Sequence, residues 1–241
     1  MAGSGSEVPQ SSELLRGPGF RVRYDFPRIA PEVVDRFKKL DIAVVSDLMN
    51  RLYTLQSGLH PIVPHSEALL VGTACTVKVF PGDNLMVHAS LDCAGPGDIV
   101  VVDTAGSNAN AVLGDMVTNK ARSCGIAGFV VDGLVRDVDG MREAGVPVFA
   151  RGVTPRGPLH RGPGELNYPI ACGGVTVNAG DLVIAGTDGV VIVPHESVDE
   201  ILERAEVRMA KETLYVDAVK KGDFTNDWVA AALRADDCQI D

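Results

Sequence analysis

The chain has 241 residues, of which 46% are apolar, 5% are aromatic and 26 are glycine, a composition typical of a compact α/β protein and not of a disordered chain. Its formal net charge of −10 argues against broad electrostatic binding of nucleic acid or of an anionic membrane surface. No apolar run approaches membrane-spanning length and the N-terminus lacks a signal-peptide pattern, so we expect a cytoplasmic protein with no nucleic-acid or membrane partner.

The N-terminal part is predicted to hold a leader, two short helices and a strand. Residues 1–18 are small and polar without periodicity, which predicts a disordered leader. A first helix should run from about Pro31 to Lys39, with the proline in its first turn. Ser46 is typical of the N-cap of a second helix, whose buried side would carry Leu48, Met49 and Leu52. Residues 69–80 alternate and are rich in β-branched side chains, which predicts one long strand or a strand pair.

A short helix and a buried strand are expected next. Asn84 can cap a helix that carries His88 and ends at the glycine–proline turn 95–97. A lone histidine on a helix is more often a hydrogen-bonded structural residue than a catalyst, and both interpretations of His88 stay open. Residues 99–103, with the sequence IVVVD, are typical of a strand buried on both faces.

The centre of the chain, residues 114–137, has the pattern of a helix, a glycine turn and a strand. A helix from about residue 113 to 123 rises roughly 15 Å at about 1.5 Å per residue. The strand that follows returns by roughly 20 Å at about 3.3 Å per residue. The start of the helix and the end of the strand should therefore share one edge of the sheet. This geometry predicts that Asp115 lies close to Arg136 and Asp137.

That edge has the parts of a small-anion and metal site. The first helical amides, those of Asp115, Met116 and Val117, should be unpaired and able to hold a carboxylate. Arg136 adds a planar guanidinium that grips a carboxylate with two hydrogen bonds. Asp115 and Asp137 supply oxygen ligands suited to Mg²⁺ or Mn²⁺. The alternative is that Asp115 only complements the helix dipole while Arg136 and Asp137 form a surface pair.

Beyond this centre the pattern predicts a helix over 139–144 and a strand over 146–150. Residues 151–164 form a basic, Gly/Pro-rich excursion that carries His160. We interpret it as a functional cover, a subunit contact or a solvated hairpin. Residues 180–186 and 188–194 should pair as a hairpin through an Asp-Gly turn.

The C-terminal part is predicted to be helical. Ser197 and Glu200 have the spacing of a capping box, which should open a long amphipathic helix that continues to about Lys220. A last helix is expected around Trp228, the only tryptophan, and should dock onto this subunit or onto a neighbour.

The cysteines are scattered along the chain and odd in number: Cys75, Cys93, Cys124, Cys172 and Cys238. A disulfide or zinc framework needs clustered spacings, so we expect reduced thiols. A catalytic cysteine needs a positioned base, and the sequence points to none.

The chain resembles the RraA-like family, which includes the class II 4-hydroxy-4-methyl-2-oxoglutarate/4-carboxy-4-hydroxy-2-oxoadipate aldolases. The resemblance extends over about residues 29–220. The family's aspartate, twenty residues and then Arg-Asp are matched by Asp115, Arg136 and Asp137. The segments SDLMNR, PGDNL and TDGVVIVP also match.

This resemblance implies an α/β fold of the α-β-β-α sandwich type (RraA-like, swivelling β/β/α). It implies a single catalytic domain over 19–221, with a C-terminal helical tail over 222–241. It also implies a homotrimer or hexamer with a Mg²⁺ or Mn²⁺ site at the subunit interface. The tail differs from that of the better-known aldolases, so the natural substrate, the preferred metal and the role of the Trp228 tail stay open.

The resemblance also assigns roles to single residues. Asp137 would approach the metal directly and Asp115 would act through water. Arg136 would hold the pyruvate end of the substrate beside the amides of Gly114, Asp115, Met116 and Val117. A glutamate on the long helix of a neighbouring subunit would complete the outer shell, with Glu212 as the best match and Glu206 as its competitor. One form of the family signature has an acid three positions after the metal aspartate, where this chain has Gly140.

The function that follows is a divalent-metal-dependent retro-aldol cleavage of a pyruvate-derived 4-hydroxy-2-oxo acid, with Arg136 and Asp115 as catalytic residues. It would proceed through a metal-stabilised enolpyruvate, and oxaloacetate would be decarboxylated by the same machinery. A metal-ordered water is the expected base, because the sequence offers no well-placed histidine. A Schiff base on Lys78 or Lys120 is disfavoured, since nothing indicates that either is desolvated.

Two other functions remain as alternatives. One is a non-catalytic RraA-type regulator that binds and inhibits a ribonuclease or another protein partner. The other is a methyltransferase, which is disfavoured because no glycine-rich nucleotide loop follows a strand.

Overall fold

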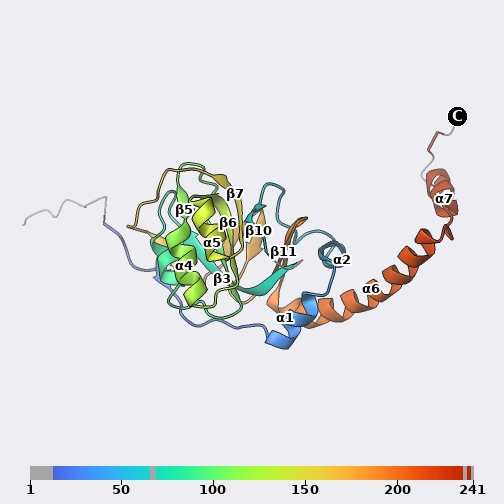
Figure 1. The fold of residues 1–241 in the computed structure, drawn as a ribbon, viewed down its shortest axis with the longest axis horizontal. Coiled ribbons are helices and arrows are strands. Elements are labelled where there is room, and N and C mark those ends of the chain that lie inside the picture. Colours follow the sequence, from blue (N-terminus) through green and yellow to red (C-terminus); the bar gives the residue numbers. More distant parts are fainter. Residues whose placement is uncertain (1–12, 66–68, 236–237, 240–241) are drawn as a thin grey trace, which may run out of the picture.

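The structure is a computed structural model that describes residues 13–65, 69–235 and 238–239. The body is a mixed α/β unit, and two C-terminal helices extend away from it (Figure 1). The predicted leader, 1–18, lies mostly outside the described residues.

One ten-stranded sheet forms the centre of the body, and its main path runs β1-β8-β3-β4-β6-β7-β2. The neighbouring central strands are parallel: β3 (Leu70–Val79), β4 (Asp98–Asp103), β6 (Gly128–Val135) and β7 (Val148–Val153). Shorter strands continue the sheet on both sides: β8 (Gly164–Leu166) lies between β3 and β1 (Phe20–Val22), and β2 (His60–Val63) lies beside β7. A further short strand, β5 (Ala111–Leu113), pairs in parallel with the end of β6. The apolar runs of β4 and β6 are buried on both faces, as the sequence predicts.

A second layer of strands packs against this centre. The predicted hairpin is present as β11 (Leu182–Gly186) and β12 (Gly189–Val193), and β11 also pairs with the start of β3. A separate two-stranded sheet consists of β9 (Ile170–Cys172) and β10 (Val175–Val177). Buried side chains from both layers form one shared core, which includes Ile99, Val130, Phe149, Val183 and Ile192.

Helices cover both outer faces. One face carries α3 (Leu85–Ser90), α4 (Asp115–Ser123) and α5 (Val138–Ala144), packed on the parallel strands. The other carries α1 (Pro31–Phe37), α2 (Ile42–Leu48) and the start of α6 (Val198–Lys220), packed on the hairpin side. Figure 1 shows α4 and α5 on one side of the strands and α1 and α2 on the other. This order of layers is the predicted α-β-β-α sandwich.

Of the three predicted helix caps, Ser46 is wrong in position, whereas Asn84 and Ser197 precede their helices as predicted but make no side-chain cap hydrogen bond. The second helix begins at Ile42, and its N-cap is Asp41, whose carboxylate accepts a hydrogen bond from the amide of Ala43 at 2.7 Å. Ser46 lies inside this helix, and Leu52 is 74% exposed instead of buried. Asp41, which precedes the apolar Ile42, is the cap instead of Ser46, because it can begin the helix about one turn earlier. Ser197 does precede α6, but its side chain makes no cap hydrogen bond, because a 3-10 turn, η1 (His195–Ser197), leads into the helix.

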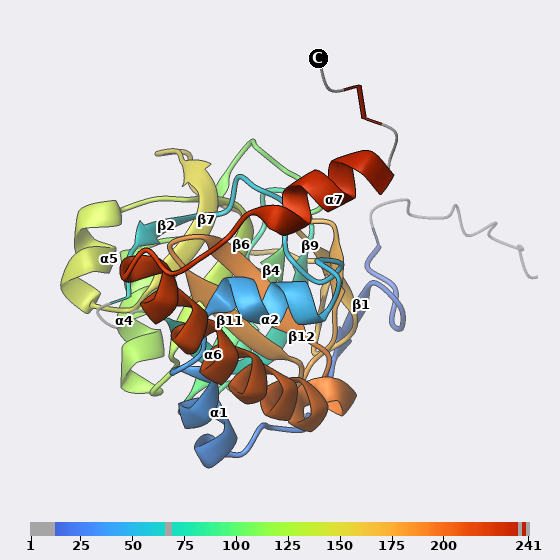
Figure 2. The ribbon, with the colours of Figure 1, turned by 90° about the vertical axis from the view of Figure 1, so that its right-hand side faces the viewer.

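The C-terminal helices leave the body. Only the first part of α6 is buried, through Val198, Ile201, Leu202 and Ala205. The rest of α6 and the last helix, α7 (Asp227–Ala235), project outward, as Figures 1 and 2 show from two directions. Trp228 is 67% exposed, so docking onto its own subunit is wrong, and docking onto a neighbour stays a prediction. Among the described residues, no helix combines the length and the apolar character needed to cross a membrane.

Candidate active site

The end of β6 meets the start of α4, as the central segment predicts. Leu113, two residues before α4, lies beside Val135 in the sheet, and its carbonyl accepts a hydrogen bond from the amide of Arg136 at 2.9 Å. The backbone thus ties the residues before α4 to the residues after β6. Asp115, Arg136 and Asp137 consequently lie around one cavity.

This cavity has a volume of about 260 Å³. Six of the residues that the sequence predicts for the site line it: Gly114, Asp115, Met116, Val117, Arg136 and Asp137. Its remaining wall was not predicted and consists of Asn84, His88, Leu113, Pro158 and His160. A larger cavity of about 510 Å³ is lined by two ion pairs, Arg28–Asp98 and Lys38–Asp35, and by none of the predicted site residues.

Asp137, next to Arg136 in the chain, has an unusual backbone conformation. Asp137 has φ 58° and ψ 45°, the left-handed region that non-glycine residues seldom adopt and that often marks a functional position. Its carboxylate Oδ2 lies 3.2 Å from Nε of Arg136, and both side chains are about two-fifths exposed. Glycines make room for them: a Cβ atom on Gly114 would be 2.7 Å from Oδ2 of Asp137, and one on Gly157 would be 2.5 Å from Nη1 of Arg136.

The amides at the start of α4 are less available than the sequence predicts. Asp115 uses its own Oδ1 to accept a hydrogen bond from the amide of Met116 at 2.6 Å. The amide of Val117 donates to the carbonyl of Gly114 at 3.2 Å. Gly114 has no side chain to cap the helix, so Asp115 takes over part of that role. In the described chain only the Asp115 amide among these three makes no hydrogen bond, so the prediction of three unpaired amides is wrong.

The two carboxylates fit a hydrated divalent cation. Among the described residues no group of three or more His, Cys, Asp or Glu side chains is arranged to hold a metal. Mg²⁺ usually keeps several of its waters and takes only one or two carboxylates from the protein. Asp115 and Asp137, both partly exposed at one cavity, can provide that pair. The described residues of one chain do not provide a complete set of protein ligands for a metal ion.

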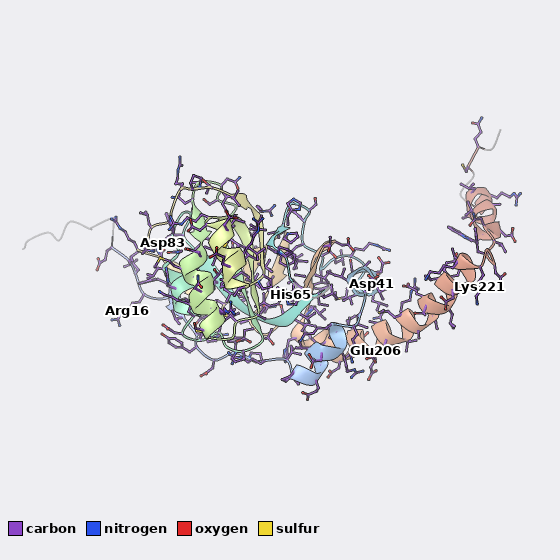
Figure 3. All side chains as sticks on the ribbon, viewed as in Figure 1. Arg16, Asp41, His65, Asp83, Glu206 and Lys221 are labelled. Carbon is purple, nitrogen blue, oxygen red and sulfur yellow. The ribbon has the colours of Figure 1, made fainter. Side chains whose placement is uncertain are left out.

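Neither candidate glutamate on α6 lies in this cavity. Glu212 pairs with Arg208 at 2.6 Å, and Glu206 is held by both Nε and Nη2 of Arg36 at 2.8 and 2.7 Å. Figure 3 shows Asp83, beside the cavity wall, at the opposite end of the molecule from Lys221 at the end of α6. Glu212 can reach a cavity of this kind only in another copy of the chain.

Two histidines that the sequence analysis did not place line the cavity. His160, in the loop after β7, accepts or donates a hydrogen bond through Nδ1 to Oδ1 of Asn84 at 2.6 Å. The ring of His88 lies edge-on to it, with centroids 5.7 Å apart. Burial lowers the pKa of His88, and electrostatic interactions with Lys120 and His160 lower it further. The expectation that no histidine is well placed is therefore wrong. One sequence signal could have indicated these histidines. Asn84 and His88 are spaced by one helical turn, and the later loop 151–164, which carries His160, is able to cover them.

The lysines considered for a Schiff base do not line the cavity. Lys78 lies 3.8 Å from Oδ2 of Asp103 and is about half exposed, and Lys120 is exposed on α4. All five cysteines lie in the described residues and are free thiols, as expected.

Known proteins share both the sequence pattern and the fold. The model of the RraA-like family, described as Aldolase/RraA, matches residues 42–192, which contain the whole cavity but not α6. A protein of Halalkalibacterium halodurans named "Putative 4-hydroxy-4-methyl-2-oxoglutarate aldolase" is 36% identical over 181 residues, which cover 75% of this chain and 85% of that protein.

Solved structures agree with this result. An uncharacterized protein from Pseudomonas syringae superposes with a TM-score of 0.73 and 30% identity, covering 84% of this chain and 93% of that one. Streptomyces coelicolor RraAS2, described as an unusual member of the RNase ES inhibitor RraA protein family, superposes with a TM-score of 0.72 and 31% identity, covering 79% of this chain and 98% of that one.

Proposed function

We propose that this chain, which belongs to the RraA-like family, is an aldolase that cleaves a 4-hydroxy-2-oxo acid and releases pyruvate. The observation that carries the proposal is the meeting of Asp115, Arg136 and Asp137 around one cavity, although twenty residues separate the first from the second. A guanidinium and two carboxylates at a helix start are the groups needed to bind a keto acid and a divalent cation.

Each of these residues has a task in the cleavage. Arg136 binds the carboxylate of the pyruvyl end and stabilises the oxyanion that develops at C2 as the C3–C4 bond breaks. The free amide of Asp115 lies on the same side and favours negative charge there. Asp137 and Asp115 would hold Mg²⁺ or Mn²⁺, which when bound supplies a Lewis acid for the 2-oxo group. Decarboxylation of oxaloacetate needs the same stabilisation of enolpyruvate, so we propose it as a side activity.

We further propose that the active assembly is a homotrimer or hexamer. In this arrangement a neighbouring copy would bring the glutamate of α6, with Glu212 ahead of Glu206, toward Asp137. The projecting α6 and the absence of Glu212 from the residues that line its own cavity support this proposal.

Release of pyruvate from oxaloacetate and from 4-hydroxy-4-methyl-2-oxoglutarate tests the function directly. We expect release with added Mg²⁺ or Mn²⁺ and none after treatment with EDTA. Absence of release with either substrate at any metal concentration would rule the aldolase out.

The second candidate is a regulator that binds a ribonuclease, and the likeness to RraAS2 favours it. Such a role needs neither Arg136 nor a metal. Inhibition of a purified ribonuclease of the RNase E type that survives both EDTA and Arg136→Ala, in a chain that releases no pyruvate, would establish the regulator instead.

A further inference from the structure

We propose that His160 is the general base and acid of the cleavage, and that Asn84 is the positioning residue that orients it. The inference rests on the aldolase function proposed above and adds a role for the cavity wall that the sequence did not predict. It replaces the metal-ordered water as the base that removes the proton of the C4 hydroxyl.

Asn84 determines which nitrogen of His160 carries the proton. The Asn84 side chain is only 3% exposed, and its Nδ2 donates to the carbonyl of Val112 at 3.1 Å. The opposite orientation of the amide would set two acceptor oxygens against each other, so Oδ1 must face His160. Oδ1 can only accept, and therefore Nδ1 of His160, 2.6 Å away, is the donor. The neutral ring then has its lone pair on Nε2, the form that a general base requires.

Nε2 is available for this task. His160 lines the cavity, and within the described residues no protein group makes a hydrogen bond to Nε2. Arg136 and Asp137 line the same cavity, whose volume is about 260 Å³. A substrate whose pyruvyl end is bound by Arg136 therefore lies in the cavity that the imidazole of His160 also lines.

The loop that carries His160 is fixed on both sides of it. The amide of Leu159 donates to the carbonyl of Gly82 at 2.8 Å, and the amide of Arg161 donates to Oδ2 of Asp83 at 2.5 Å. Earlier in the same loop, the carbonyl of Gly157 accepts a hydrogen bond from Nδ2 of Asn110 at 2.5 Å. His160 is exposed, but its backbone is anchored to the residues that precede α3. This anchoring gives the imidazole the fixed position that proton transfer needs.

Charged groups of both signs line the cavity or adjoin His160 in the chain. Burial lowers the pKa of its neighbour His88 on α3, and the charge of Lys120 on α4 lowers it further. Arg161 on the same loop and Arg136 across the cavity are positive, whereas Asp83, Asp115 and Asp137 are negative.

The proton balance of the reaction closes on this one residue. Nε2 removes the proton of the C4 hydroxyl, and the oxygen electrons form the carbonyl of the departing 2-oxo acid. The C3–C4 bond breaks, and its electron pair forms the C2–C3 double bond of enolpyruvate. His160, now protonated and still donating through Nδ1 to Asn84, returns the proton to C3 and gives pyruvate. No other reactant is needed.

Comparing two reactions at the same site distinguishes a base role of His160 from a structural role. Retro-aldol cleavage must remove a hydroxyl proton before the C3–C4 bond breaks, whereas decarboxylation of oxaloacetate breaks its carbon–carbon bond without that step. Both reactions protonate C3 of enolpyruvate afterwards, and water can supply that proton when His160 is absent. We expect His160→Ala to lower kcat for cleavage of 4-hydroxy-4-methyl-2-oxoglutarate by about 10²-fold or more, with KM little changed. Decarboxylation should fall by less than about tenfold, the range of a lost contact. Added imidazole should restore part of the cleavage activity. His60→Ala, an exposed histidine on β2, is the matched control.

Asn84 has its own readout. In Asn84→Ala, Nδ1 of His160 loses its acceptor, so the tautomer with a free Nε2 is no longer fixed. Cleavage should then fall more than decarboxylation, as in His160→Ala. Added imidazole should restore little activity, because the ring of His160 is still present. Because Asn84 is buried, circular dichroism of this variant is compared with the wild type, and His160→Ala carries the test if Asn84→Ala does not fold.

The outcomes are distinct. Equal losses of both activities in His160→Ala, or a raised KM with unchanged kcat, would overturn the inference, since the histidine would then support the fold or bind a carboxylate. If the wild type catalyses neither reaction, the proposed function fails, and His160 is not a base in this chain.

Discussion

Gly140 of α5 lies directly against Asp115 of α4: a Cβ atom on Gly140 would be 2.7 Å from the Cβ atom of Asp115 and 3.0 Å from its Oδ2. The backbone atoms of the two helices can therefore approach at the cavity only because position 140 has no side chain. The family signature to which the chain was compared can have an acid at this position. In this chain such a side chain would displace Asp115.

Gly140→Ala should lower kcat/KM for pyruvate release by about tenfold to 100-fold, because a shift of about 1 Å at a catalytic group can cost that much. The free energy of unfolding should fall by about 1–3 kcal/mol, as for other overpacked sites. Enzyme assays and urea titration measure the two effects. Gly95→Ala is the control, because a Cβ atom there has no neighbour within 4 Å. Unchanged activity in Gly140→Ala would mean that the position of Asp115 does not matter.

Arg136→Ala should reduce pyruvate release by about 10²- to 10³-fold, because one donor to a developing oxyanion is lost. Arg136→Lys should recover only part of the loss, since an ammonium cannot make two parallel hydrogen bonds to a carboxylate. The side chain is 38% exposed, so the fold should stay intact by circular dichroism. Arg142→Ala, which removes an exposed arginine paired with Asp139, serves as the control. Retained turnover in Arg136→Ala would exclude Arg136 from the reaction.

Asp137→Asn should abolish both activity and the response to Mg²⁺. Asparagine tolerates the left-handed backbone of this position, so the substitution removes the charge with little strain. Steady-state assays over a range of Mg²⁺ and calorimetric titration of Mg²⁺ check the two parts. Asp139→Asn removes a carboxylate that is 95% exposed two residues away and should have no effect. Near-normal pyruvate release in Asp137→Asn contradicts the metal-dependent mechanism.

Glu212→Gln should lower activity, whereas Glu206→Gln should not. Glu206 is already bound by Arg36 of its own chain, and the pair is exposed, so its loss should also cost little stability. Mixing Glu212→Gln subunits with Arg136→Ala subunits should restore some activity, since intact sites then form between chains. No complementation, in mixtures shown by light scattering to exchange subunits, would place both residues in sites of one chain or exclude Glu212.

The stability of the protein should fall as the pH drops below about 6.5, the usual pKa of histidine, through His88. Burial holds the pKa of His88 below 6.5 in the folded protein, so between these two values the unfolded chain binds a proton that the folded chain does not. This contribution is complete above 6.5 and is lost as the pH falls. Urea titrations at several pH values should show a smaller fall in His88→Gln than in the wild type. An identical fall in both would assign the effect to other groups, and His60→Gln controls for an exposed histidine.

Sequence periodicity by itself determined most of the fold. The apolar runs within β4, β6 and β11 had one interpretation, because near-continuous apolar runs of this length are typical of strands buried on both faces. The return of β6 along the helix that precedes it was also enough to bring Asp115 near Arg136. The sequence pattern did not decide whether Asp41 or Ser46 caps the second helix. Both side chains can accept the same kind of hydrogen bond from a backbone amide.

Only the tertiary structure decided the second wall of the cavity. His160 comes from a loop with no periodicity, and its contact with Asn84 crosses 76 positions of the chain. The availability of the amides at the start of α4 likewise depended on how the Asp115 side chain turns. Repeating patterns specify elements because they reflect burial on one face, whereas the joining of two loops depends on how all the layers pack together.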